Sequence, residues 1–446
     1  MNENAVSPEE LKKFSEEFNS NEKNIVAANS SVRNGLEAAA EDYRSERALQ
    51  SEFNVSLKQG PVTDQKSSGR CWLFSALNTM RYEFINKYGL ESFELSQNYL
   101  FFYDKLEKAN YFLESAIKTA GEPLDGRLYS FISMNPLGDG GQWSMFSNLV
   151  EKYGVVPKSA YPDSANAEKS RSFVHYITSK LREDAAELRK LVNAGESMEK
   201  IRDRKARQLS EIYRCLVIAL GEPPASFDFI VRTKDGKVME DRGITPKEFY
   251  RKYFGYDFDD FVSVINAPSD DKPFDRMYTV KFLGNVVEGR PVSYLNLRMD
   301  VIKKAVIAQL KDGHPVWFGS DCVQFLNREK GIFDRQASGI ENLLGIKLGF
   351  TKGERLMYGD SAMNHAMVIQ GVNLGADGKP DRWRIENSWG EDSGNKGYFT
   401  ASDSWFDEFV YQIVVGKKYL DDSVLRLLDQ KMIELEPWDP MGTLAD

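Results

Sequence analysis

The sequence predicts a protein of the α+β class. Apolar residues recur at helical spacing through much of the first half of the chain, whereas short apolar runs typical of strands dominate the second half. Helices and strands do not alternate regularly and no internal repeat is visible, which argues against a parallel βαβ fold. With 446 residues, of which 41% are hydrophobic and 12% aromatic, the chain can form two or three domains around a large core.

Charge and cysteine content narrow the class of protein. A formal net charge of −9 argues against a nucleic-acid-binding assembly, an alternative that a salt-dependent gel shift would test. The chain shows no signal-peptide pattern and no apolar stretch of about 18 residues, so we expect a cytoplasmic protein without a membrane span. Three cysteines occur far apart, at Cys71, Cys215 and Cys322. We therefore expect no disulfide framework, no metal site and no cofactor.

Residues 1–60 are predicted to be a largely helical lead-in. Ser7 is suited to cap the first helix and Pro8 to open it. The apolar stripe of this helix consists of Leu11, Phe14 and Phe18. A short extended stretch, residues 55–62, then leads into the first motif of the chain.

Cys71 opens the next predicted helix, residues 71–88. Its apolar positions are Leu73, Phe74, Leu77, Met80, Phe84 and Ile85. An isolated cysteine in such a helix is usually a small buried hydrophobic residue. The unpaired N–H groups at a helix N-terminus, however, favour a thiolate and lower its pKa. We expect Arg70 to add positive potential there, and we interpret Cys71 as a nucleophile with Gln65 as an oxyanion donor.

The segments that follow are predicted to build walls around this helix. Ser96 is suited to cap a second helix, and residues 136–141 form a glycine-rich loop before a third helix at residues 142–153. Such a loop is usually a simple turn, but Gly140 and Gly141 would also let a peptide backbone approach closely. Residues 166–221 predict a charged helical hairpin, whose charges form either a solvated face or subunit contacts.

The second half of the chain mixes strands with one clear helix. Asp235-Gly236 predicts the turn of a β-hairpin that starts at residues 227–232. Further strands are expected at residues 278–283, 291–297 and 315–319, and a helix is expected at residues 299–310.

His365 opens an apolar strand, where a histidine alone is more often structural than catalytic. A second strand ends 22 residues later in Asn387, and Trp389 follows. A cysteine nucleophile needs an imidazole to take its proton, and that imidazole needs an acceptor on its other nitrogen. An asparagine amide provides this acceptor without adding charge, and Trp389 could cover the hydrogen bond.

These residues resemble the papain-like cysteine peptidases, whose order of cysteine, histidine and asparagine is matched by Cys71, His365 and Asn387. More closely, the chain resembles the aminopeptidase C / bleomycin hydrolase family. The supporting motifs are Gln65, Ser67–Trp72, Leu95–Gln97, Gly140–Gly141, Asn364–Ala366, Glu386–Gly390 and the ending Trp438–Ala445. They span nearly the whole chain and are specific only in combination.

The resemblance implies a two-lobe papain-like fold with an inserted helical hook region and a C-terminal arm. The implied segments are a lead-in (1–60), a helical lobe with Cys71 (61–165), the hook (166–290), a β-rich lobe with His365 and Asn387 (291–430) and the arm (431–446). About 290 residues separate Cys71 from His365, against roughly 130–150 in papain, which indicates the insertion. Such hooks imply assembly into a homohexamer. Two disulfide positions of secreted relatives are occupied by Ser68 and Gly138.

The resemblance also implies roles for individual residues. Cys71 attacks the peptide carbonyl, His365 transfers protons, Asn387 orients His365 and Gln65 stabilises the oxyanion. Gly140 and Gly141 bind the backbone of the peptide substrate, Asn364 lines a specificity pocket, and Trp72 and Trp389 support the site.

The arm would lie in the cleft, where its carboxylate end, Ala445 and Asp446, meets the substrate's amino group and makes the enzyme an aminopeptidase. Asp446 is either retained or trimmed by the enzyme itself. The alternatives are a frayed tail, an endopeptidase with an incidental tail and a catalytically inactive scaffold.

Overall fold

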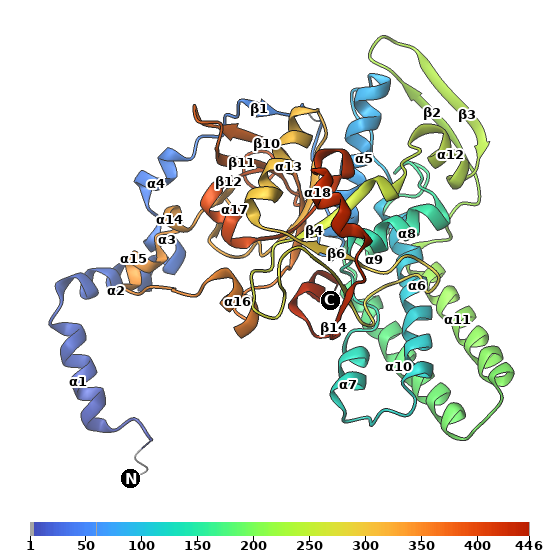
Figure 1. Ribbon diagram of the computed structural model, residues 1–446, viewed down its shortest axis with the longest axis horizontal. Coiled ribbons are helices and arrows are strands. Elements are labelled where there is room, and N and C mark those ends of the chain that lie inside the picture. Colours follow the sequence, from blue (N-terminus) through green and yellow to red (C-terminus); the bar gives the residue numbers. More distant parts are fainter. Residues whose placement is uncertain (1–3, 59, 446) are drawn as a thin grey trace.

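The computed structural model describes residues 4–58 and 60–445 (Figure 1). A mixed β-sheet lies at its centre, with the order β14-β5-β6-β4-β13-β7-β10-β11-β12-β9-β8 and with β1 paired to β10. Its strands are β1 (Val55–Ser56), β4 (Phe261–Ile265), β5 (Arg276–Val280), β6 (Tyr294–Asn296), β7 (Val316–Ser320), β8 (Leu326–Asn327), β9 (Ile332–Phe333), β10 (His365–Leu374), β11 (Pro380–Glu386), β12 (Tyr398–Ser402), β13 (Val410–Gly416) and β14 (Ile433–Leu435).

The middle strands β7, β10 and β13 are almost completely buried. A strand that is covered on both faces is a continuous apolar run, which explains why Met367-Val368-Ile369 and Ile413-Val414-Val415 lack alternation. Strand β10 pairs antiparallel with β7 on one side, where His365 lies opposite Ser320, and with β11 on the other. The start of β10 is therefore held between two neighbouring strands.

A group of helices packs beside the sheet. They are α5 (Cys71–Tyr88), α6 (Gln97–Lys118), α7 (Arg127–Met134), α8 (Trp143–Tyr153) and α9 (Ala165–Glu168). Helix α5 contacts β10 on one side and α6 and α8 on the other. As predicted, Ser96 caps α6 by accepting a hydrogen bond from the backbone of Tyr99. Gly89 ends α5 in a left-handed conformation.

The charged hairpin is confirmed as α10 (Arg171–Asn193) and α11 (Met198–Leu220). Both helices pack against α6, so the hairpin has a buried apolar side as well as a charged one. The predicted β-hairpin is also confirmed: β2 (Phe227–Arg232) pairs with β3 (Val238–Ile244), and Gly236 adopts a positive φ of 86° in the turn. It leads to α12 (Pro246–Tyr253), and this part of the chain lies at the right in Figure 1.

The remaining elements surround the sheet. The N-terminal helices are α1 (Pro8–Asn19), α2 (Glu22–Asn34), α3 (Leu36–Ala40) and α4 (Tyr43–Ala48). Later helices are α13 (Met299–Lys311), α14 (Arg335–Ser338), α15 (Ile340–Leu344), α16 (Lys352–Tyr358), α17 (Asp403–Phe409) and α18 (Asp422–Leu425), and short 3₁₀ turns are η1 (Phe258–Asp260), η2 (Lys417–Tyr419), η3 (Arg426–Asp429) and η4 (Pro440–Ala445). Ser7 and Glu10 form a capping box at α1, but α1 extends from the body and has no buried residue (Figure 1).

Two apolar cores flank the contact between α5 and β10. One joins the helices α5, α6, α8, α10 and α11, and the other lies within the sheet under α13 and α17. The α+β class and the division into two lobes therefore agree with the sequence prediction. No helix of the described residues combines the length and apolar character needed to cross a membrane.

Candidate active site

Cys71 is the first residue of α5 and lies at the boundary between the two cores. The backbone N–H of Ala366 in β10 points at its sulfur, with a distance of 3.4 Å from nitrogen to Sγ. The hydroxyl of Ser75, one helical turn further on, lies 2.7 Å from the carbonyl oxygen of Ala366 and 2.8 Å from that of Cys71. These contacts fasten the start of α5 to the start of β10.

The charge state of Cys71 differs from the sequence expectation. Burial raises the pKa of its thiol to about 11, while the backbone N–H groups of Ala366, Trp72 and Cys71 act in the opposite direction. The cost of removing the thiolate from water therefore outweighs its stabilisation by the helix N-terminus, which was expected to lower the pKa. Burial therefore favours the neutral thiol over the thiolate.

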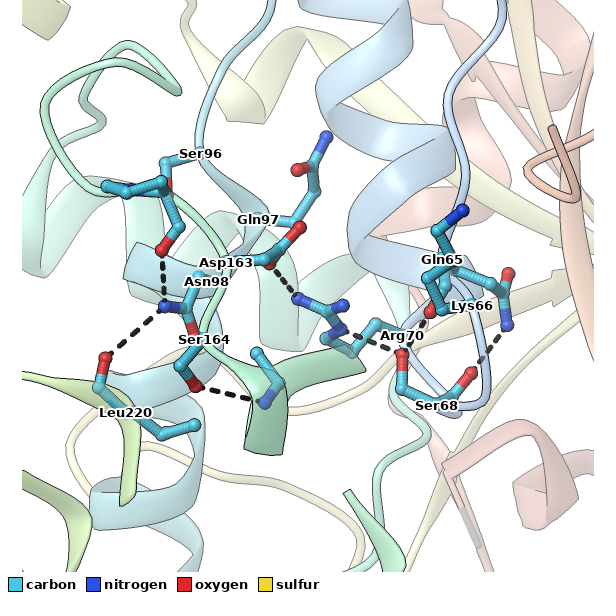
Figure 2. A network of polar contacts seen from close by, with 12 residues as sticks. Gln65, Lys66, Ser68, Arg70, Ser96, Gln97, Asn98, Asp163, Ser164 and Leu220 are labelled. Atoms are coloured by element: carbon cyan, nitrogen blue, oxygen red, sulfur yellow. Dashed lines mark hydrogen bonds and ion pairs between the residues drawn. The ribbon is translucent and has the colours of Figure 1, made fainter. Parts of the chain in front are cut away.

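The sequence predicts that Arg70 adds positive potential beside Cys71, but the structure shows that its charge is already paired. Its guanidinium is fully buried and forms an ion pair of 2.6 Å with Asp163, and its Nε donates to Ser68 Oγ at 2.8 Å (Figure 2). The rings of Phe74 and Phe101 stack on it. The charge of Arg70 is compensated by a carboxylate 93 residues away in sequence. Through its bond to Ser68, Arg70 fixes the turn before Cys71.

His365 and Asn387 lie together in the structure. Nε2 of His365 donates to Oδ1 of Asn387 at 2.8 Å, so the neutral ring keeps Nδ1 as its basic nitrogen. The same Asn387 oxygen accepts the N–H of Ser388, which holds the amide in this orientation. Trp389 stacks on the imidazole with 4.9 Å between ring centroids and covers it. Burial lowers the pKa of His365 to about 4, the bond to Asn387 opposes this shift, and Arg328 reinforces it.

Gln65 lies in the turn that precedes α5 and is tied to the segment after Asn387. Its backbone N–H donates to Ser388 O at 2.8 Å, and its side-chain oxygen accepts from Ser388 Oγ at 2.6 Å. Its Nε2 donates to Ser68 O at 2.6 Å (Figure 2). A primary amide has two N–H groups, so one of them remains beyond this bond. Gln65, Cys71, His365 and Asn387 thus come from four segments and lie in one connected site.

The glycine loop lies against Trp72 and the C-terminal arm. Trp72 donates its indole N–H to the carbonyl of Asp139 at 2.8 Å, and a methyl group on Gly141 would lie 2.5 Å from the indole ring. A methyl group on Gly140 would meet the backbone of Leu444. Both positions therefore require glycine for close approach. Binding of a substrate backbone at Gly140 and Gly141 stays a prediction.

The arm occupies the same region, where its last described residues form the 3₁₀ turn η4. The carbonyl of Leu444 accepts the N–H of Gly141 at 2.9 Å, and Thr443 donates its hydroxyl to Met363 O at 2.8 Å. Tyr294 donates to the carbonyl of Met441 at 3.0 Å. The side chains of Met441 and Leu444 are buried, so this part of the tail is not frayed. Ala445 is the last described residue, and Asp446 lies outside the described residues.

Asn364 precedes His365 but its amide is used elsewhere. Its Nδ2 donates to Asp321 at 2.5 Å and its Oδ1 accepts the N–H of Cys322 at 3.0 Å. These bonds anchor the turn before β10, so a role for Asn364 in a specificity pocket stays a prediction.

Sequence reasoning missed several polar residues around the site. Asp139 accepts the N–H of Gly69 at 3.1 Å and pairs with Lys105 at 2.8 Å, and Lys108 donates to the carbonyl oxygens of Gly138 and Gly140. Lys105 holds the pKa of Asp139 at about 2 despite burial, which by itself would raise it. The helical spacing of the two lysines was visible, but their burial was not. Among the described residues no group of His, Cys, Asp and Glu could hold a metal ion.

Comparisons with known proteins agree with this geometry. The Peptidase C1-like family matches residues 5–442. Aminopeptidase C of Listeria monocytogenes serovar 1/2a is 47% identical over 437 residues, with 98% of each chain covered. Bleomycin hydrolase of Homo sapiens is 40% identical over 455 residues, with 100% of each chain covered. The crystal structure of PepW from Lactobacillus rhamnosis HN001 matches with a TM-score of 0.97 and 46% identity, covering 98% of this chain and 99% of that one.

A buried cysteine at a helix N-terminus, close to a histidine held by an asparagine, defines the site of a papain-like cysteine peptidase. The chain belongs to the Peptidase C1-like family. Within it the chain is a cysteine-type peptidase of the aminopeptidase C / bleomycin hydrolase group, and the predicted papain-like α+β fold is confirmed.

Proposed function

We propose that this papain-like cysteine aminopeptidase removes residues from the amino end of peptides, with its own C-terminal arm acting as the ruler. The observation that carries the proposal is the hydrogen bond of 2.9 Å from Gly141 N–H to Leu444 O. The arm thereby occupies a backbone donor of the glycine loop. A bound peptide would otherwise use the same donor, since a peptide that adds to a protein as a strand is recognised through main-chain hydrogen bonds.

Acyl transfer begins with the proton of Cys71. Because burial favours the neutral forms of both Cys71 and His365, the thiolate forms by proton transfer to Nδ1 of His365, so that two opposite charges arise together and attract each other. The thiolate attacks the carbonyl of the peptide bond. His365 then returns the proton to the leaving amine, and water hydrolyses the thioester with His365 as base.

Asn387 and Gln65 support these steps. Asn387 fixes the ring of His365 through the bond to Nε2, and Trp389 and Trp72 shield the site from water. The remaining N–H of Gln65 and the backbone N–H of Cys71 stabilise the tetrahedral oxyanion. A single donor of this type contributes about 2.7–4 kcal/mol to the transition state.

The arm gives the peptidase its direction. Because the seated arm takes the N–H of Gly141, that donor is not free for the substrate. We infer that the substrate backbone pairs with the groups of Gly140 and Gly141 that the arm leaves free, while Ala445 and the end of the arm at Asp446 meet the ammonium group of the substrate. A longer N-terminal extension would collide with the arm. This reasoning favours an aminopeptidase over an endopeptidase with an incidental tail.

We propose a separate role for each segment of the chain. Residues 61–165 and 291–430 supply the site, residues 431–446 the arm, residues 1–60 a lead-in and residues 166–290 the hook. We propose a cytoplasmic enzyme, since all three cysteines are free.

A homohexamer would cover the apolar side chains of α1, of which Leu11 is 58% and Phe14 53% exposed. Multi-angle light scattering on wild type and on a chain without residues 1–20 tests the assembly.

Deletion of residues 443–446 tests the ruler. The truncated enzyme should cleave free-amine peptides more slowly and should begin to cleave N-acetylated peptides, because the obstacle in the cleft is gone. A truncated Cys71→Ala enzyme is the matched control and should cleave neither. If the truncated enzyme is active on free-amine peptides but leaves acetylated ones intact, the ruler is wrong.

A further inference from the structure

Glu386 is a buried carboxylate that the steps above do not use. It is the last residue of β11, directly before Asn387, and it is 1% exposed. Its oxygens accept three hydrogen bonds from side chains. Asn78 and Arg81 each donate to Oε1 at 3.0 Å, and Gln370 donates to Oε2 at 2.7 Å.

The donors come from the two other elements that carry the site. Asn78 and Arg81 lie on α5, about two and three helical turns after Cys71. Gln370 lies on β10, five residues after His365. One carboxylate therefore contacts the cysteine helix and the histidine strand, and its own strand ends at the asparagine.

The network also reaches the turn that carries Gln65. Asn78 Nδ2 lies 2.9 Å from Oγ1 of Thr63, two residues before Gln65. The carbonyl of Thr63 in turn accepts the N–H of Gly390 at 3.1 Å. Hydrogen bonds thus join all four segments of the site, namely α5, β10, β11 and the turn that carries Gln65, at positions away from the reacting atoms.

Stability alone is a weak reason for such a buried pair. The side chains of Arg81 and Glu386 are 6% and 0% exposed, and their loss of hydration offsets much of their attraction. Burial raises the pKa of Glu386, whereas Arg81, Gln370 and Arg384 lower it, and Tyr398 on β12 also senses its charge. A well-packed apolar pair is often equally stable, but it would not hold several segments in one fixed register.

We propose that Glu386 is a positioning residue for the acyl-transfer reaction, holding α5, β10, β11 and the Gln65 turn in the register that brings Cys71, His365 and Asn387 together. This inference rests on the proposed roles of those three residues. Glu386 touches no reacting atom. It acts through the elements that carry them.

The double variant Arg81→Met/Glu386→Met tests the inference, because it removes the network without leaving an unpaired charge. A misplacement of about 1 Å costs roughly 100-fold in rate, so kcat should fall about 10- to 100-fold while KM stays within about twofold. The rate at which iodoacetamide alkylates Cys71 can be followed by peptide mass mapping. Its dependence on pH should differ between the double variant and wild type. A purely structural role would change thermal stability but not this profile.

A matched control removes a different pair with a buried carboxylate. Lys180 and Asp184 form an ion pair of 2.9 Å in the hairpin, with Asp184 fully buried. Lys180→Met/Asp184→Met should keep wild-type kcat and the wild-type alkylation profile. If the Arg81/Glu386 double variant does not fold, Gln370→Met keeps the ion pair and should still lower kcat about 10-fold at unchanged KM.

The outcomes separate this inference from the proposed function. A folded network variant with wild-type kcat and a wild-type alkylation profile overturns the positioning role alone, provided that Cys71→Ala is inactive. Full activity of Cys71→Ala overturns the proposed function and the positioning role together.

Discussion

The buried ion pair between Lys272 and Asp439 anchors the arm, and breaking it should turn an aminopeptidase partly into an endopeptidase. The two side chains are 2.9 Å apart and only 1% and 9% exposed. Lys272→Met leaves Asp439 with the N–H of Met441, 2.9 Å away, and without its cation. Removing one partner of a buried pair costs about 3–5 kcal/mol.

That cost exceeds any single contact that holds the arm further along, but not their sum. The hydrogen bonds of Leu444, Thr443 and Met441 each contribute about 1 kcal/mol net. Burial of Met441 and Leu444 adds about 1.5–3 kcal/mol each, so the arm is weakened rather than lost. Since about 1.4 kcal/mol is tenfold, the ratio of detached to seated arm should rise at least about 100-fold.

The assay compares a free-amine peptide with its N-acetylated form. Lys272→Met should cleave the acetylated peptide faster than wild type does and the free-amine peptide more slowly. The control is Lys281→Met, because the pair of Lys281 with Glu436 is 2.9 Å long but solvent-exposed and contributes little. The reasoning is refuted if limited proteolysis shows a detached arm in Lys272→Met and the acetylated peptide is still not cleaved.

Three further predictions concern His365, Gly141 and Asp446. Burial lowers the pKa of His365 from 6.5 to about 4, so its contribution to stability is complete above pH 6.5 and is lost toward pH 4. Urea denaturation at pH 7 and 4.5 should show wild type losing roughly 2 kcal/mol more than His365→Leu, and equal losses would contradict this. Gly141→Ala should raise KM by pushing its methyl group against Trp72, whereas Gly121→Ala, which points into open space, should not. If the enzyme trims Asp446, intact mass will show wild type without its C-terminal aspartate and Cys71→Ala with it, each against its own calculated mass; retention of Asp446 in both would reject self-trimming.

Local sequence rules predicted the elements better than the charges around the site. Ser7 and Ser96 cap helices because a serine oxygen before an apolar periodic run can accept a hydrogen bond from a free backbone N–H of the first helical turn. The β-hairpin at Asp235-Gly236 follows equally local rules. Such features need only neighbouring residues, so they are readable without the fold.

Features that depend on distant residues escaped prediction. The ion pair of Arg70 with Asp163 removed the expected potential beside Cys71, and burial reversed the expected shift of the Cys71 pKa. Glu386 was visible only as the residue before Asn387, since its donors on α5 lie about 300 residues away in sequence. The positions of Cys71, His365 and Asn387 were predicted through family resemblance, whereas helical and strand periodicity alone would have left each of them a structural residue.

The most direct test of the central claim is hydrolysis of a panel of fluorogenic aminoacyl substrates by wild type and Cys71→Ala. Each substrate is offered with a free amino group and with an N-acetyl group. We expect wild type to hydrolyse free-amine substrates and to leave acetylated ones intact, and Cys71→Ala to hydrolyse neither. Activity retained by Cys71→Ala would contradict the role of the thiol, and equal rates on free and acetylated substrates would contradict an aminopeptidase.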